Sequence, residues 1–192
     1  MRIRRPHILL SLVLLVGLSG CGNGDGLSVK VESLLENLPV LEQTAAAWRD
    51  DAYLAFADVP LHNGNSSPWL IAAAFQSPSE DSESLLIMLQ EDGSLTAQRI
   101  PHTVPVVQSD PITREDWALD SQEALEHALD EGGRTFLEDH SERQCSFLRL
   151  ARDPTVPTEP VIWRLAVRDC EVRGFFEETI INPITGAVIR RK

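Results

Sequence analysis

The side chains with the clearest chemical potential in this sequence are the thiols of its three cysteines, Cys21, Cys145 and Cys170. In an oxidising compartment, two leftover thiols pair more often than they stay free, so we expect a disulfide between the two later cysteines, Cys145 and Cys170. Such a bridge would close a loop of about 25 residues and add about 3 kcal/mol of stability on the chain-entropy model. The sequence has no Cys-x-x-Cys motif, which argues against thiol exchange.

Cys21 differs from the other two cysteines in what precedes it. Three arginines lie within the first five residues, and residues 8–18 form an apolar run. A run of about a dozen residues is too short to span a bilayer, which needs about 20, and is typical of a secretion signal. The segment Leu18-Ser19-Gly20-Cys21 resembles the lipobox of bacterial lipoproteins. This resemblance implies cleavage before Cys21 and lipidation of its thiol and of the new N-terminus.

Lipidation at Cys21 would fix where the protein works. Two or three acyl chains on one residue attach a protein stably, whereas one chain is marginal. Residue 22 is Gly rather than Asp, which by the same resemblance favours the outer membrane, facing the periplasm. A plain secretory peptide and an uncleaved anchor remain alternatives. Residues 21–28 include three glycines and predict a short flexible tether, so we expect the folded part to lie close to the membrane.

The remaining reactive side chains show no pattern typical of catalysis or metal binding. None of the four histidines after Cys21 has metal-ligand spacing, and we interpret them as solvated: His62, His102, His127 and His140. The acidic residues 80–83 lack the glycine and alternating ligands of a calcium loop, so we expect a solvated turn. No nucleophile elbow, zinc-protease helix, phosphate loop or dinucleotide fingerprint occurs. We therefore expect a protein that is not an enzyme, without metal or cofactor, although a triad assembled from distant residues would leave no motif.

The charge of the chain limits its partners. The formal charge is −12, and removal of the three arginines before Cys21 would make it −15. Such a surface repels phosphate backbones and anionic headgroups, which argues against nucleic acid as a partner. It attracts a basic partner or divalent cations, or it serves only to keep the protein soluble. The exported part is long enough for one ordinary domain or two very small ones.

The first half of the exported part predicts helix followed by strands. Helical spacing of apolar residues starts at Val31, and Pro39 predicts a kink or a division into two short helices. A helix-like pattern resumes over residues 43–57, with four expected core residues: Trp48, Ala52, Leu54 and Phe56. Residues 69–75, 84–90 and 95–100 predict strands, with a tight turn at Asp92-Gly93 before the last. We expect a three-stranded antiparallel meander.

The second half repeats this order after a proline-rich connection. Asp120 and Glu123 have the spacing of a capping box, and they predict a helix that Gly132-Gly133 ends. Its expected inner face consists of Ala124, Leu125, Ala128 and Leu129. Strands are predicted over residues 145–151, 161–167, 175–181 and 187–189. Residues 182–186, Asn-Pro-Ile-Thr-Gly, have the chemistry of a turn.

The two halves resemble each other, and the second resembles a known family. All four tryptophans fall at matching places, with Trp48 and Trp117 at the helices and Trp69 and Trp163 at the strands. Gln122-Glu123-Ala124, the strand around Trp163 and the turn at residues 182–186 resemble the PepSY domain, although Asn182 replaces a commoner Asp and the insertion over residues 133–160 is long. The resemblance implies an α+β fold of two helix-plus-antiparallel-meander units packed together. The expected organisation is a signal peptide at residues 1–20, a tether at 21–28 and units at 29–108 and 109–192.

The PepSY resemblance implies a binding role, because members are exported or membrane-attached and are thought to restrain peptidases or act as binding modules. We expect a lipid-anchored envelope protein that binds a protein or peptide without catalysis. A structural or assembly lipoprotein of an envelope complex is the first alternative, and an envelope hydrolase is the second. Neither the partner nor any ligand-binding residue follows from the sequence.

Overall fold

The computed structural model describes residues 29–61, 69–102, 109–134, 137, 146–153, 155, 160–167 and 177–191. The elements in chain order are α1 (Leu34–Trp48), β1 (Tyr53–Pro60), β2 (Trp69–Ser77), β3 (Glu80–Gln90), β4 (Leu95–Pro101), α2 (Ser121–Ala128), the π-helical turn η1 (Leu129–Gly133), β5 (Phe147–Arg152), β6 (Val161–Val167), β7 (Glu177–Ile181) and β8 (Val188–Arg191). The predicted α+β class is confirmed.

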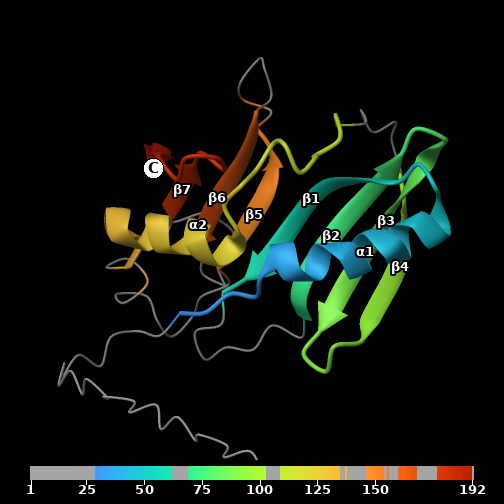
Figure 1. Ribbon diagram of the computed structural model, residues 1–192, viewed down its shortest axis with the longest axis horizontal. Coiled ribbons are helices and arrows are strands. Elements are labelled where there is room, and N and C mark those ends of the chain that lie inside the picture. The colour runs from blue at the N-terminus through green and yellow to red at the C-terminus, as the bar shows by residue number, and fades with distance from the viewer. Residues whose placement is uncertain are drawn as a thin grey trace, which may run out of the picture.

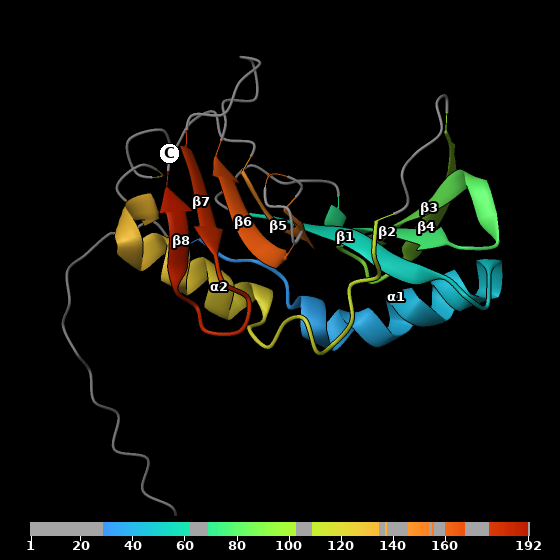
Figure 2. The same ribbon diagram turned by 90° about the horizontal axis from the view of Figure 1, so that it is seen from above.

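Within the described residues, the eight strands belong to one antiparallel sheet, in the order β4-β3-β2-β1-β5-β6-β7-β8. Consecutive strands are neighbours except at the centre, where β1 pairs with β5 from Phe56↔Ala151 to Pro60↔Phe147. Each helix therefore precedes four strands that follow one another in the sheet. Both helices cover the same face of the sheet, α1 over the strands of the first half and α2 over those of the second (Figures 1 and 2).

One continuous apolar core lies between the helices and the sheet. It takes buried side chains from both helices, including Leu34 and Leu41 of α1 and Leu125 of α2, and from both halves of the sheet. Apolar burial of this kind supplies about 25 cal/mol for each Å² removed from water, so the shared core ties the two halves together.

Trp163 occupies the centre of the second half of this core. Its side chain is fully buried, and its ring meets that of Trp117 edge to face with 5.9 Å between centroids. Its indole Nε1–H donates a hydrogen bond to the carbonyl of Leu119, 3.0 Å away. The segment that enters α2 is thereby held against β6.

The turn between β7 and β8 forms as its residues predict. The side chain of Asn182 accepts hydrogen bonds from the backbone N–H groups of Ile184 and Thr185, and Gly186 has φ +74°. A Cβ atom at Gly186 would clash with the imidazole ring of His127, so this glycine also permits α2 to approach the turn closely. The carbonyl of Pro183 accepts from the N–H groups of Ala118 and Leu119. The turn therefore helps to dock α2.

The N-termini of α1 and α2 lie close together (Figure 1). Side chains at the start of α2 also cap α1. The predicted capping box is confirmed, with Asp120 and Glu123 bonding to each other's backbone N–H groups. Asp120 Oδ1 also accepts from the N–H of Leu35, and Ser121 Oγ accepts from that of Leu34, each at 3.0 Å. The positive ends of two helix dipoles thus meet at one carboxylate, which accepts from N–H groups of both helices that have no partner within their own helix.

Replacing Asp120 by alanine should therefore cost more than the loss of an ordinary cap. One N-cap is worth about 0.5–2 kcal/mol, and this side chain serves two helices, so we expect a loss of about 2–3 kcal/mol in urea unfolding. Asp120→Asn keeps the acceptor oxygen and should lose much less. Ser33→Ala, which removes a cap from α1 alone, is the matched control. A loss for Asp120→Ala no larger than that for Ser33→Ala would contradict the shared cap.

Several local predictions are wrong. Residues 43–57 are not one helical stretch, because α1 ends at Trp48 and β1 begins at Tyr53. Two long-range neighbours, β2 and β5, pair with β1 and override the local helical pattern. Of the two outcomes predicted for Pro39, the division into two short helices is wrong, because α1 runs through Pro39 with Leu38 and Leu41 buried on either side of it, and the kink stays a prediction. Gly132 and Gly133 belong to η1, which continues α2.

Candidate functional site

The face of the sheet opposite the helices presents apolar and aromatic side chains over its central strands. Residues paired across neighbouring strands lie on the same face, so the register identifies which residues belong to this one. Across β1, β2 and β3, two such rows are Phe56, Ala74 and Leu86, and Asp58, Ala72 and Met88. Ile162, Ala166 and Ile180 on the same face are buried, so its accessible part lies over β1 to β5. We call this part the open face, and it comprises the half-buried Phe56, Asp58, Leu86, Met88, Phe147 and Arg149 and the exposed Gln98.

Asp58 and Arg149 form the polar centre of the open face. The guanidinium donates two hydrogen bonds to the carboxylate, each 2.6 Å long, across the β1–β5 junction. The same guanidinium lies over the rings of Phe56 and Phe147, 4.9 and 5.2 Å from their centroids. Its hydrogen bonds to Asp58 raise the pKa of Arg149 further above its usual value. Two hydrogen bonds to one carboxylate and two rings fix this side chain, which is a rigid element suited to recognition.

Arg164 extends the polar centre on β6. It pairs with Arg149 in the strand register, and its guanidinium lies 3.1 Å from the carboxylate of Glu178 and 3.8 Å from that of Asp153. Each arginine of the two therefore has an acidic partner. The arrangement offers shape, aromatic surface and oriented hydrogen-bonding groups, and these suit binding rather than bond breaking.

Ser84 and His102 form a contact that sequence reasoning missed. Ser84 Oγ lies 2.7 Å from Nε2 of His102, whose Nδ1 lies 3.0 Å from the carbonyl oxygen of Asp81. A carbonyl partner favours the tautomer with hydrogen on Nδ1, which leaves Nε2 to accept the serine proton. A hydroxyl beside an oriented imidazole is the pairing that activates nucleophilic serines. The register of the β3–β4 hairpin, where Ser84 pairs with Ile100, was the signal that could have found it.

The other histidines and the acidic run do not assemble into a site. His127 is exposed on α2, as predicted, with its ring edge against Gly186. His62 and His140 lie outside the described residues. Among the residues that are described, no group of three His, Cys, Asp or Glu side chains could hold a metal ion. Residues 80–83 begin β3 rather than forming a turn, because Ser77 pairs with Glu80 and closes the hairpin earlier.

Within that acidic run, Glu80 is held in its charged form. The hydroxyl of Ser82, the guanidinium of Arg49 at 2.9 Å and the N–H of Ser82 lower its pKa from 4.5 to about 2. A depressed folded-state pKa stabilises the protein above pH 4.5, and this stabilisation is lost as the pH falls through 2. We expect the loss of thermal stability between pH 4.5 and 2 to be smaller in Glu80→Gln. Glu91→Gln, at an exposed acid of the next turn, should leave the profile unchanged.

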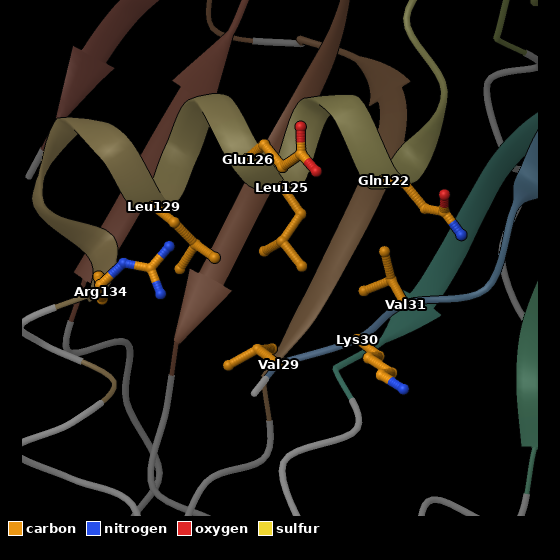
Figure 3. Close-up of a pocket in the computed structure, with 8 residues that line it drawn as sticks. All are labelled: Val29, Lys30, Val31, Gln122, Leu125, Glu126, Leu129 and Arg134. Atoms are coloured by element: carbon orange, nitrogen blue, oxygen red, sulfur yellow. The ribbon is translucent and has the colours of Figure 1, made fainter. Parts of the chain in front are cut away.

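A groove lies beside α2, away from the open face (Figure 3). Leu125 and Leu129 point across it toward Val29 and Val31, and its volume is about 470 Å³. The remaining lining consists of Lys30, Gln122, Glu126 and Arg134. The groove can accept a small apolar group, but none of the lining side chains is paired as a nucleophile and a base.

The three cysteines of the sequence analysis, Cys21, Cys145 and Cys170, lie outside the described residues, so lipidation and the disulfide stay predictions. Cys145 comes shortly before β5 and Cys170 shortly after β6. Among the described helices, none is long and apolar enough to cross a membrane.

Comparisons with protein families, with curated proteins and with solved structures found no match to this chain.

Proposed function

We propose that this chain is a lipid-anchored envelope protein whose open face binds another envelope protein or peptide, with restraint of a peptidase as one form of that role. The observation that carries the proposal is the Asp58–Arg149 pair, held between Phe56 and Phe147 on a sheet face that the helices leave uncovered. Aromatic side chains and arginine are enriched at the centres of protein interfaces. The acidic body favours a basic partner.

The topology supports the resemblance to two PepSY-like units. Each helix is followed by four sequential strands, and the units meet through their first strands, β1 and β5. Trp163 lies on β6, and the turn at residues 182–186 follows β7. A strand with Trp followed by a strand that ends in this turn is the order that the PepSY resemblance implies. An exported binding module is the role that this resemblance suggests.

Co-purification from solubilised membranes tests the binding role. We expect the wild-type protein to retain a partner that Met88→Glu, on the open face, releases. Gln43→Glu on the exposed side of α1 is the matched control and should retain it. A single soluble protease among the retained proteins would favour restraint, and a large complex would favour the structural role. Equal recovery with both variants would contradict binding through the open face.

A hydrolase is the second candidate, and the Ser84–His102 contact is the observation that favours it. Its imidazole is oriented by a neutral carbonyl rather than by a carboxylate, which gives less stabilisation to an imidazolium. Labelling with a fluorophosphonate separates the two candidates. The binding role predicts no label, whereas label on Ser84 that disappears in His102→Ala would establish a nucleophile.

A further inference from the structure

The strand β4 is a long edge of the sheet that the described chain leaves without a neighbour. It lies at one end of the strand order (Figure 1). Six of its seven residues are exposed. Along an antiparallel strand, every second residue forms backbone hydrogen bonds to the neighbouring strand. Just beyond the two ends of β4, the N–H of Gln90 donates to the carbonyl of Ser94, and the N–H of His102 donates to that of Ser82. The even-numbered residues are therefore the bonded ones. Residues 96, 98 and 100 therefore bond to β3. The N–H groups of Leu95, Ala97 and Arg99 point outward.

The protection of this edge is slight. Pro101 stands at an outward position and has no N–H to offer, and Arg99 adds one charge. The opposite edge, β8, is shorter, with four residues, and its sequence carries two arginines. Of the two edges, β4 is the better template for strand addition, because main-chain bonds supply affinity to an extended segment whatever its side chains.

The charges around β4 indicate what kind of segment would fit. The β3–β4 hairpin carries five acids against the single base Arg99: Glu80, Asp81, Glu83, Glu91 and Asp92. A second copy of this chain would bring the same acidic hairpin to the edge, and the whole chain is itself strongly negative. Repulsion thus disfavours self-pairing, and attraction favours a basic segment.

We propose that an extended basic segment of a partner protein adds to β4 as a ninth strand. This rests on the proposed binding function and names how the partner attaches. Along the added strand, alternate side chains would lie beside Thr96, Gln98 and Ile100, next to the open face. The edge and the open face would then form one continuous contact.

The test uses the full chain purified in detergent and two fluorescent hexapeptides. One alternates valine with arginine and lysine, and the other alternates valine with glutamate and aspartate. We expect the basic peptide alone to bind, as measured by fluorescence anisotropy. Ala97→Pro removes an outward N–H without removing a bond to β3, and should weaken binding about tenfold or more. Ala97→Thr keeps the N–H and is the matched control, with unchanged binding expected.

Several outcomes would overturn the proposal. The basic peptide could fail to bind, or the acidic peptide could bind as tightly as the basic one. The basic peptide could also bind Ala97→Pro as tightly as the wild type while the thermal unfolding of the variant is unchanged. If light scattering shows a dimer that Ala97→Pro dissociates, a second copy occupies the edge instead. Failure here is distinct from failure of the proposed function, because partner recovery that depends on Met88 would persist without any role for β4.

Discussion

Replacing Cys21 by serine is expected to release the protein from the membrane almost completely. A serine hydroxyl does not form the thioether that the lipobox resemblance implies, so neither acyl chain of that linkage would be attached. Stable anchoring needs two lipid signals, and this variant would lack both chains of the thioether-linked group. The measurements are incorporation of labelled fatty acid and fractionation of the envelope.

The matched control for this prediction is Ser19→Ala, which keeps a small residue within the same four-residue segment. It should be labelled and should sediment with membranes like the wild type. Unchanged fractionation of Cys21→Ser would contradict the anchor. Loss of labelling with retained attachment would instead favour an uncleaved signal segment.

The second large effect is expected at Trp163. Replacing it by alanine removes a fully buried indole, its edge-to-face contact with Trp117 and its hydrogen bond to Leu119. Truncation of buried aromatic residues costs about 3–5 kcal/mol, and the lost hydrogen bond and ring contact place this case at the upper end. Domains of this size are stable by about 5–15 kcal/mol, so much of the total would disappear. Urea unfolding followed by circular dichroism measures the change.

Trp163→Phe separates packing from hydrogen bonding. It keeps an aromatic ring in the core but leaves the carbonyl of Leu119 without its donor, so we expect a smaller loss of about 1–3 kcal/mol. A loss below about 1 kcal/mol for Trp163→Ala would mean that the second half of the core does not depend on this residue.

Local signals predicted a large part of the fold. The capping box at Asp120 and the turn at residues 182–186 form as their residue types predict, and Gly93 adopts φ +80° in the predicted tight turn. These features succeed because each depends on contacts within a few residues. The helical prediction for residues 43–57 failed for the opposite reason. Its second part belongs to β1 and becomes a strand only because β2 and β5 pair with it.

The candidate site was much less accessible to sequence reasoning. Asp58 and Arg149 are 91 residues apart, and nothing local indicates that β1 pairs with β5. Phe56 was predicted as a core residue, yet it lies half-buried on the open face, because the error at β1 also assigned its side chain to the wrong face. Once the β1–β5 pairing is known, alternation along Phe147-Leu148-Arg149 places an aromatic ring and a guanidinium together.

Site-specific photo-cross-linking in living cells tests the central proposal of binding through the open face most directly. A photoreactive amino acid is placed at position 88 or 98 on the open face, or at position 43 on α1. We predict one dominant cross-linked protein from positions 88 and 98, and none from position 43. Equal cross-linking from all three positions, or none from 88 and 98, would contradict it.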